Sequence, residues 1–495
     1  MFTNKGSNSH RNQQWELACI DAMVPEDHLL RMIDQHIDFS FIEELVRPYY
    51  HESLGRPSIP PVRLFKMMLI GYLYGIRSDR QLEREIMTNV AYRWFLGLGL
   101  MDKVPDHSTI SWNRRVRFKG TTVFQDIFEK VAQLAIEHHM VGGRLLVTDS
   151  THIQASANKN KFEKQVITQT PQEYLAELEK AVNEDRDKHG KPPLPPSQET
   201  PEVKMNKVST TDPESGYMNR NGKPEGFAYL DHRTVDHKYN IITDTYVTAG
   251  NVNDSTVYVD RLKYQVETFR LTHLEAVVLD SGYCTPHICK TVTEMEIFAV
   301  IAEKNEPKFD GIFPKKQFTY DRENDQYICP QGQVLHYVTT NRQGYREYHS
   351  NRETCSRCPF LSKCTKERKG IRKIQRHVWE DHKEKVIANS YSPEGQAIYK
   401  IRKETIERSF ADAKELHGLR RTRFRGREHV QNQAYMTAIA QNIKKIARHL
   451  QKGVGCFASV ALLCVRCRVR DVRLAFNGLF RQPEFFQLKR LLQAE

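Results

Sequence analysis

Two short apolar runs, each closed by an aspartate, constrain the fold of this chain most strongly. Leu145–Thr148 leads into Asp149, and Ala276–Leu279 leads into Asp280, which a Ser-Gly pair follows. A run of about four apolar residues closed by a charge and a turn residue is typical of a buried strand. Sites in open α/β sheets form just beyond the carboxyl ends of such strands. The runs therefore predict two buried strands that present their carboxylates to a common point.

A third carboxylate, Glu407, lies in a stretch rich in Lys and Arg, from Tyr399 to Leu419, that we expect to be one helix. Residues three, four and seven apart are neighbours on a helix surface, so Glu407 shares its face with several cations. These cations are Lys400, Lys403 and Lys414, with Arg408 beside them. Two aspartates and a glutamate form the hard-oxygen ligand set that Mg²⁺ or Mn²⁺ prefers. Two such ions about 3.5–4 Å apart support in-line phosphoryl transfer, so the acidic trio predicts that chemistry.

Each of these features also has a simpler interpretation. Taken singly, Asp149 and Asp280 fit the turn and N-cap positions at which Asp is favoured. The cationic stretch fits a solvated helix with ordinary intrahelical ion pairs. Glu404 is a competing carboxylate that helical geometry does not exclude. The three acidic residues together, with their flanking sequences, favour the metal site.

The basic residues of this chain are clustered. The 495 residues carry a net charge of +13, and between Lys400 and Arg448 there are 13 Lys and Arg against 5 Asp and Glu. Such clustering favours a polyanionic partner over a charge that serves solubility alone. The sequence lacks the Gly-x-x-x-x-Gly-Lys-Ser/Thr loop and the His-Glu-x-x-His motif, so a nucleoside triphosphatase or a zinc peptidase has no support.

No targeting or membrane segment is expected. The first twenty residues contain no apolar signal core. No stretch reaches the roughly 18 apolar residues that a membrane helix needs. We therefore expect a cytoplasmic protein with no membrane partner.

Residues 25–140 have a helical pattern, in which short helices alternate with tight turns. The last of these helices carries Trp112 and a basic set, namely Arg114, Arg115, Arg117 and Lys119. This order is similar to a helix-turn-helix arrangement, in which the final helix contacts DNA. The alternative is a plain helical bundle with one basic face.

From Val141 to Ala302, strand and helix patterns alternate, which is typical of α/β layering. Two segments interrupt or follow this alternation. Residues 155–226 are charged and Pro-rich, a composition that does not form a core of its own. Residues 304–376 are punctuated by Gly and carry cysteines, and helices resume near Ser392.

Four of the ten cysteines form a spaced set in this second segment: Cys329, Cys355, Cys358 and Cys364. Four thiolates from two chain segments predict a tetrahedral Zn²⁺ site that would staple an insertion with little core. An iron–sulfur cluster uses the same ligands, and four unligated thiols are the simpler alternative. Cys456, Cys464 and Cys467 form a weaker cluster that we interpret as core or tail thiols.

The acidic motifs resemble those of bacterial insertion-sequence transposases of the DDE type. The similar segments are Val147–Ala155, Leu279–Cys284 and Ile406–Arg420, and Arg423–Gly426, Asn432–Gln433 and Asn442–Lys445 resemble that family's downstream helix. The similarity extends from about residue 30 to 450. It implies a ribonuclease-H-like core with a mixed sheet, in which the first two acidic residues lie on neighbouring parallel strands.

The resemblance also implies a function. Such enzymes are polynucleotidyl transferases that cut at transposon ends and join the freed 3′-OH to target DNA, using Mg²⁺. By resemblance, Asp149, Asp280 and Glu407 are the metal ligands for two Mg²⁺ or Mn²⁺ ions per active site. The implied partners are double-stranded DNA, at the element ends and the target, and a second copy in a homodimer. No small-molecule substrate is implied, and the location is bacterial and nucleoid-associated.

One departure from the family pattern concerns four residues of the basic stretch. Members often carry Tyr, Arg, Glu and Lys at fixed spacing, and here Tyr399, Arg402, Glu407 and Lys414 are present. Arg402 falls one residue early, and Lys403 occupies the expected place. Glu407 and Lys414 keep their match, whereas Tyr399 and Arg402 have no assigned role.

The predicted fold class is thus mixed α/β, with a ribonuclease-H-like core, an N-terminal all-helical domain and a Cys-rich insertion. The predicted parts are a flexible N-terminus (1–24), a helix-turn-helix-like domain (25–140), a catalytic domain (141–303 and 377–451) with its insertion (155–226), the Cys-rich insertion (304–376) and a basic tail (452–495). The residues predicted to contact DNA are Arg114, Arg115, Arg117, Lys400, Lys403, Arg408, Lys414, Arg420, Arg421, Arg423 and Arg425. Two alternatives to a transposase remain: a catalytically inactive DNA-binding descendant, and an Mg²⁺-dependent nuclease that only hydrolyses.

Overall fold

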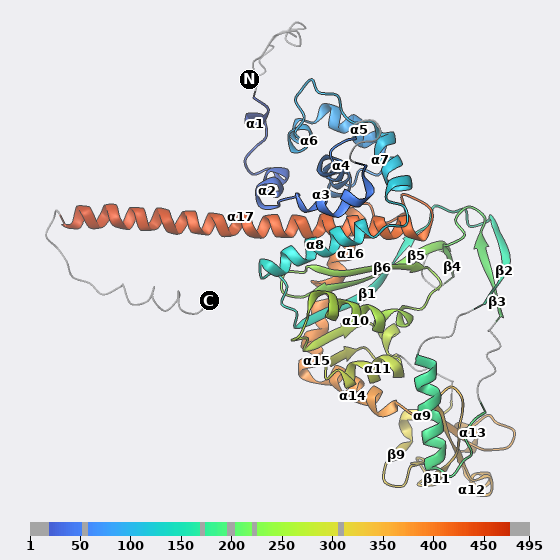
Figure 1. The fold of residues 1–495 in the computed structure, drawn as a ribbon. Helices are drawn as coiled ribbons and strands as arrows, with labels where there is room; N and C mark the ends of the chain where they lie inside the picture. The colour runs from blue at the N-terminus through green and yellow to red at the C-terminus, as the bar shows by residue number, and fades with distance from the viewer. Residues whose placement is uncertain are drawn as a thin grey trace, which may run out of the picture. The chain divides into compact units, whose positions relative to one another are not determined.

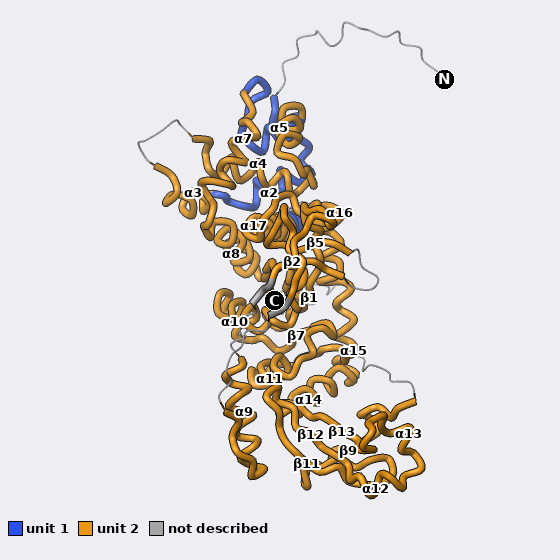
Figure 2. Tube along the Cα trace, turned by 90° about the vertical axis from the view of Figure 1, so that its right-hand side faces the viewer, with its two compact units in different colours: residues 1–39, 89–102, 443–495 blue, residues 40–88, 103–442 orange. Residues whose placement is uncertain are grey.

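The computed structural model describes residues 19–51, 58–168, 174–195, 203–219, 225–304 and 311–475. The chain forms two compact units, each made of separate stretches of the sequence (Figure 2). The first contains residues 1–39, 89–102 and 443–495, and the second contains residues 40–88 and 103–442. The long helix α17 (Arg427–Ala475) contributes residues to both units. No helix among the described residues has both the length and the apolar character needed to cross a bilayer.

The first unit is helical. It includes α1 (Ile20–Met23), α2 (Leu29–His36) and α6 (Val90–Phe95), together with the later part of α17. Phe39 and Phe95 pack edge to face with their ring centroids 6.2 Å apart. The buried guanidinium of Arg93 donates to the backbone carbonyl of Asp102, which holds the loop after α6 closed.

The second unit begins with helices, namely α3 (Phe41–Val46), α4 (Pro61–Leu73), α5 (Asp79–Thr88), α7 (His107–Trp112) and α8 (Val123–Glu137). Proline at the first position of α4 fits a helix start, because its missing N–H would have had no intrahelical partner. Gly75 follows α4 with φ of 67°, a left-handed conformation that ends the helix. Asp106 caps α7 by accepting from the Ser108 N–H at 2.7 Å. A π-helical turn, Asn113–Arg117, continues from α7.

The central sheet of the second unit is mixed (Figure 1). Its strands are β1 (Leu145–Gln154), β4 (Gly216–Met218), β5 (Gly226–Asp236), β6 (Ile242–Ala249), β7 (Ala276–Leu279) and β8 (Phe298–Ile301). The spatial order is β6-β5-β1-β7-β8, and β4 also pairs with β5. The pairs β1–β5 and β5–β6 are antiparallel, whereas β1–β7 and β7–β8 are parallel.

This topology is that of a ribonuclease-H-like fold. Three antiparallel strands come first in the sequence, and two parallel strands follow, each reached through a helix. The helix α10 (Tyr258–Phe269) connects β6 to β7, and α11 (Pro286–Glu294) connects β7 to β8. Helical crossovers are what parallel neighbours require, because a hairpin cannot join them. The predicted fold class is therefore confirmed.

Two apolar layers enclose the sheet. On one face, α10, α11 and α14 (Glu380–Tyr391) bury a cluster with β7 and β8 that includes Leu279 and Ile301. A second cluster joins Ile153 and Tyr229 of the sheet to α16 (Ile406–Glu415) and the start of α17. Because β7 is covered on both sides, all four of its residues are apolar and buried, as the sequence predicts.

The sheet is interrupted by a first insertion between β1 and β5. It contains the antiparallel pair β2 (Phe162–Thr168) and β3 (Val203–Ser209), and between these strands in the sequence the helix α9 (Tyr174–Lys188). The apolar face of α9 has no core within its own segment. Instead, Leu178 and Val182 pack against Trp379, which lies far away in the sequence.

A second insertion lies between β8 and α14. It forms a five-stranded antiparallel sheet in the order β13-β12-β11-β10-β9. The strands are β9 (Thr319–Asp321), β10 (Gln326–Ile328), β11 (Val334–Thr340), β12 (Tyr345–Ser350) and β13 (Lys373–His377), and two short helices follow β12, α12 (Arg352–Ser356) and α13 (Leu361–Cys364). Phe318, Tyr327 and Tyr348 are among the residues of its small buried core, so this segment has more core than its composition led us to expect.

Buried ion pairs join the two insertions. Asp185 of α9 accepts from the Arg346 guanidinium of β12 and from the Thr340 hydroxyl of β11. Its neighbour Arg186 donates to the Thr340 carbonyl at 2.9 Å. Helix α9 therefore belongs, by its contacts, to the second sheet.

Candidate active site

Strands β1 and β7 place the two aspartates side by side. In the parallel pair, Val147 lies opposite Val278. Asp149 and Asp280 are each two residues further on, so the strand period of two directs both side chains to the same face. The expectation that these residues lie on neighbouring parallel strands is confirmed.

One guanidinium joins both carboxylates. Arg402 Nη2 lies 2.6 Å from Asp149 Oδ2, and Arg402 Nη1 lies 3.5 Å from Asp280 Oδ1. Arg402 Nη1 also donates to the Tyr399 hydroxyl at 2.9 Å. Arg402 is buried, with 6% of its surface exposed. The two carboxylates therefore share one guanidinium cation.

The two aspartates differ in their surroundings. The side chain of Asp149 is 20% exposed, and that of Asp280 is 49% exposed. Burial raises the pKa of Asp149, the nearby Arg402 charge lowers it, and the negative charge of Asp280 raises it further. The net direction is upward, because loss of hydration is the largest of these effects. The Arg402 charge thus favours the ionised form of Asp149 and opposes the effect of burial.

The stretch from Tyr399 to Leu419 is not one helix, and this prediction is wrong. Helix α15 (Pro393–Lys400) ends before a 3₁₀ turn at Ile401–Lys403, and α16 begins only at Ile406. Thr405 breaks the helical path with φ of −106° and ψ of −91°. Lys400 and Lys403 therefore do not share a helical face with Glu407 and Lys414.

The turn has a physical cause. Thr405 Oγ1 donates to the Ile401 carbonyl at 2.9 Å, and the same carbonyl accepts from the backbone N–H groups of Glu404 and Thr405, which closes the turn. The same turn directs Arg402 to the two aspartates. Arg402, which our sequence reasoning left without a role, is thus the cation that contacts both predicted metal ligands. The available signal was the Tyr399–Arg402 pair, at a spacing one residue short of the family pattern.

Helix α16 carries the third acidic residue. Glu407 is exposed in the first turn of α16, where the positive end of the helix dipole favours a carboxylate. The helix is fixed to the sheet by Arg233, whose buried guanidinium contacts both Ser409 of α16 and Gln441 of α17. Lys414 donates to the Thr151 hydroxyl of β1 at 2.5 Å.

The acidic trio does not form a closed single-ion site. Within the described part of the chain, one group of three or more His, Cys, Asp or Glu residues has its ligand atoms all within 4.8 Å of one another. That group is Glu83, Asp106 and His107, which also cap and pack α7. The structure brings Asp149 and Asp280 to one guanidinium, and the role of Glu407 stays a prediction.

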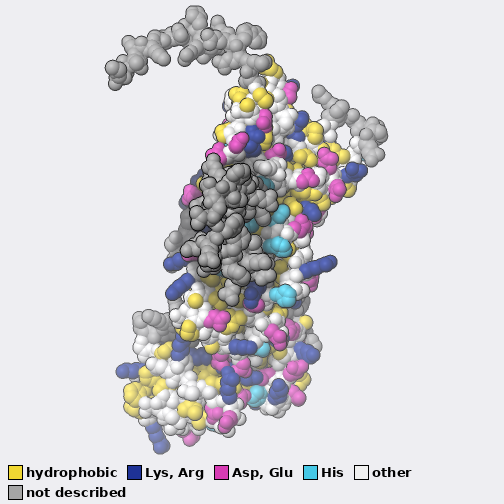
Figure 3. Space-filling view, turned by 90° about the vertical axis from the view of Figure 1, so that its left-hand side faces the viewer, with side chains coloured by type: hydrophobic (Ala, Val, Ile, Leu, Met, Phe, Trp, Pro, Cys, Tyr) yellow, Lys and Arg dark blue, Asp and Glu magenta, His cyan; other side chains and the backbone are white. Residues whose placement is uncertain are grey.

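Ten of the eleven cations predicted to contact DNA fall into two sets, and the eleventh, Lys414, is the half-buried lysine that donates to Thr151. Those exposed at the surface are Arg115, Lys400, Lys403, Arg408, Arg420, Arg421 and Arg425. Arg420 forms an ion pair with Glu415. On the face that Figure 3 shows, Lys and Arg are interspersed with Asp and Glu, so no surface of one sign identifies a binding face there.

The second set is directed inward. Arg423 lies 4.0 Å from the centre of the Tyr72 ring and donates to the Gly71 carbonyl of α4. Arg114 is 7% exposed, pairs with Asp79 at 2.6 Å and covers the Phe424 ring. Arg117 covers the Tyr50 ring at 3.9 Å. The contacts of Arg423 and Arg114 are those of packing residues, in contrast to the predicted phosphate contacts.

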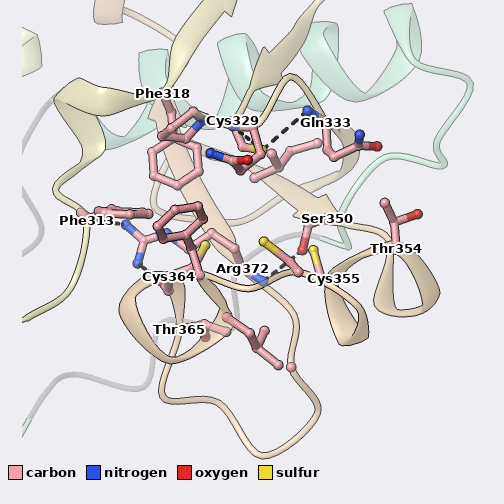
Figure 4. A pocket seen from close by; sticks show the side chains of 17 residues that line it. Phe313, Phe318, Cys329, Gln333, Ser350, Thr354, Cys355, Cys364, Thr365 and Arg372 are labelled. Atoms are coloured by element: carbon pink, nitrogen blue, oxygen red, sulfur yellow. Dashed lines mark hydrogen bonds between the residues drawn. The ribbon is translucent and has the colours of Figure 1, made fainter.

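The four cysteines of the second insertion line one cavity (Figure 4). Two backbone N–H groups, from Gln331 and Gln333, donate to the sulfur of Cys329 at 3.4 and 3.3 Å. Burial raises the pKa of Cys364, and the three other cysteines raise it further. The donor chemistry suits a thiolate-binding metal. Among the described residues, however, no three of these sulfurs lie within 4.8 Å of one another, so they would have to close to about 3.8 Å around Zn²⁺.

The fold and the paired aspartates define a protein of the ribonuclease-H-like class. Residues 18–116 match the family described as "Transposase domain (DUF772)", and residues 328–447 match the family described as "Transposase DDE domain". Both matches are to transposase families, and the second is to the DDE type, which supports the resemblance of the acidic motifs.

Solved structures give a weaker likeness. The synaptic complex of piggyBac transposase with hairpin DNA aligns with a TM-score of 0.34 and 10% identity, over 86% of this chain and 76% of that chain. The Mos1 transposase paired-end complex aligns with a TM-score of 0.15 and 9% identity, over 50% of this chain and 61% of that chain. These scores are too low to add to the assignment. A search of curated proteins gives no match.

Proposed function

We propose that this protein cuts DNA at the ends of an insertion sequence and joins the freed 3′-OH to target DNA. The reaction is an in-line phosphoryl transfer at Asp149, Asp280 and Glu407. The observation that carries the proposal is the pair of aspartates on adjacent parallel strands, both in contact with Arg402. The two carboxylates repel one another, and cations held between them offset that repulsion.

The ligand chemistry suits Mg²⁺ or Mn²⁺, two per active site. Asp149 and Asp280 would hold the ions, with Glu407 as a further ligand from α16. When bound, such ions activate the attacking oxygen and stabilise charge on the leaving oxygen. Arg402 orients Asp149 through a short ion pair, and Lys414 brings a positive charge to Thr151, two residues beyond Asp149. The protein thus contributes mainly position and charge.

The proposed partner is double-stranded DNA, bound by a homodimer during reaction. The exposed cations of the second unit, from Lys400 to Arg425, support DNA as the partner. We infer a dimer from the proposed reaction, because two element ends have to be paired before they are joined to target DNA.

A single substitution tests the proposal. Asp280→Asn keeps the size of the side chain and removes its charge, so cleavage of DNA carrying the element's ends in Mg²⁺ should be lost while binding is retained. Glu404→Gln is the matched control, because Glu404 is an exposed carboxylate next to the same turn and should leave cleavage intact. Equal loss of binding and cleavage in Asp280→Asn would assign a structural role to Asp280.

The same assay separates the two alternatives. A catalytically inactive descendant would bind end DNA and leave it uncut even in the unsubstituted protein. A nuclease would cut the DNA and produce no joined products with target DNA.

A second proposal concerns the cysteine cavity. We propose that Cys329, Cys355, Cys358 and Cys364 bind a structural Zn²⁺, because all four line one cavity and Cys329 already accepts two N–H groups. Metal analysis of the purified protein should find about one zinc per chain, falling in Cys355→Ser and unchanged in Cys19→Ser, an exposed cysteine of the first unit. Iron with acid-labile sulfide would identify a cluster instead, and neither metal would leave four thiols.

A further inference from the structure

A polar groove adjoins the end of β1, in the same compact unit as the proposed active site. It consists of two cavities that share Ser156 and Arg425 in their walls. The first is lined by Gln154, Lys161, Arg421 and Arg425 among other residues, and the second by Arg115, Arg425 and His429 among others. Their volumes are about 450 and 300 Å³. Among the residues that the structure describes, no carboxylate lines either cavity, so the charged side chains in these walls are cations.

The walls of the groove are held in place by backbone hydrogen bonds. The Gln154 N–H donates to the Arg420 carbonyl at 3.1 Å, and the Thr422 N–H donates to the Gln154 carbonyl at 2.9 Å. The Thr422 hydroxyl accepts from the Ser156 N–H. The segment that carries Arg421 and Arg425 therefore extends β1 as a short parallel partner.

Nearby acidic groups are already engaged. Buried Asp212 accepts from the Gly426 N–H at 3.0 Å and from the Tyr229 hydroxyl. Glu214 accepts from the Arg427 N–H. These carboxylates fix the loop after Arg425, while the Lys161, Arg421 and Arg425 side chains are exposed.

We infer that this groove holds the sugar-phosphate backbone of the DNA strand that leads away from the reacting phosphate. The inference rests on the proposed function, which places that phosphate at Asp149. Asp149 and Gln154 are five residues apart on β1, or about 16 Å at a rise of roughly 3.3 Å per residue. A DNA strand advances about 3.4 Å per nucleotide, so the groove begins about five nucleotides from the cut.

One cation lies between the two points. Lys414 lies at Thr151, between Asp149 and Gln154 on the same strand. Beyond it, Arg421 and Lys161 line the first cavity, Arg425 stands at the junction, and Arg115 lines the second. Positive side chains in succession along an open groove fit a repeating phosphate better than they fit one small anion.

The test measures how binding depends on salt. In the Asp149→Asn background, which binds DNA without consuming it, the affinity for a mixed-sequence duplex is followed from about 50 to 200 mM salt. Each of Lys161→Ala, Arg421→Ala and Arg425→Ala should lower the slope of log K against log salt by about 0.9. Arg425→Lys should retain the slope, and Lys369→Ala, an exposed lysine of the second insertion, should leave it unchanged.

A second readout fixes the register. Ethylation of single phosphates in end DNA should interfere with binding about five to seven nucleotides from the cut, and this interference should disappear in Arg425→Ala. Unchanged slopes in all three single variants would overturn the inference. If the parent protein binds poly-glutamate and the three variants do not, the groove would instead be assigned to an acidic polypeptide. Because binding is measured without cleavage, these outcomes are independent of Asp280→Asn, which tests the function itself.

Discussion

Removing the Arg402 charge should destabilise the second unit, because the charge of Asp149 would then be buried without a partner. In Arg402→Gln, the side chain keeps hydrogen-bond donors and loses the cation that lies 2.6 Å from Asp149. Two unit charges about 4 Å apart attract by about 4 kcal/mol at an effective dielectric constant near 20. Breaking a buried pair typically costs 3–5 kcal/mol, and the 20% exposure of Asp149 places this one near 3 kcal/mol.

The assay is urea denaturation without divalent cations, monitored by a spectroscopic signal that reports unfolding of the second unit. It gives the free energy of unfolding. The matched control is Arg408→Gln, an exposed arginine of the neighbouring helix, which should change the free energy of unfolding by less than about 0.5 kcal/mol. Arg402→Lys keeps the positive charge and lacks the bidentate guanidinium. It should therefore lower the free energy of unfolding by less than Arg402→Gln and by more than Arg408→Gln.

A double-mutant cycle identifies the cause. Asp149→Asn removes the buried charge, so Arg402→Gln in that background should cost much less than in the unsubstituted protein, with a coupling energy of about 2 kcal/mol. Additive effects of the two substitutions, or a loss in Arg402→Gln no larger than in Arg408→Gln, would refute this account of the site.

Three further predictions concern residues away from the aspartates. Burial lowers the pKa of His377 to about 4. Between about pH 6.5 and pH 4 the unfolded chain therefore binds a proton at this histidine and the folded chain does not. The free energy of unfolding should then fall by up to about 3 kcal/mol as the pH is lowered from about 6.5 toward 4. His377→Gln should weaken this fall in urea denaturation, and equal pH slopes would contradict it. Gly344→Ala should destabilise more than Gly332→Ala, by roughly 1–3 kcal/mol: both glycines have positive φ, but only at position 344 would the new methyl meet other side chains at 2.7 Å. Arg423→Ala should lower stability and leave the salt slope of DNA binding unchanged, and a slope reduced by about one would restore its predicted phosphate contact.

The sequence predicted the central strands because their signal is local. Ala276–Leu279 is apolar at every position since both of its faces are covered, and this property can be read without knowing the partners. The position of Asp280 relative to Asp149 then followed from parallel pairing, which is a general property of such sheets.

The helix break at residues 401–405 could not be predicted in the same way. The helical periodicity of the sequence continues through it, and the turn is stabilised by contacts of Arg402 with Asp149 and Asp280, more than a hundred residues away. The inward direction of Arg423 has the same origin, because its partners Gly71 and Tyr72 lie in another helix. A count of charges along the chain does not distinguish a cation that faces solvent from one that packs on a ring.

Helix α9 belongs to the insertion that follows β1, and the five-stranded sheet forms the insertion that follows β8. Contacts of Asp185 and Trp379 nevertheless join these two segments to each other. Each one therefore covers apolar surface that the other would otherwise expose. Deleting both segments together should therefore destabilise the protein less than deleting either one alone. We expect relatives to have both segments or neither.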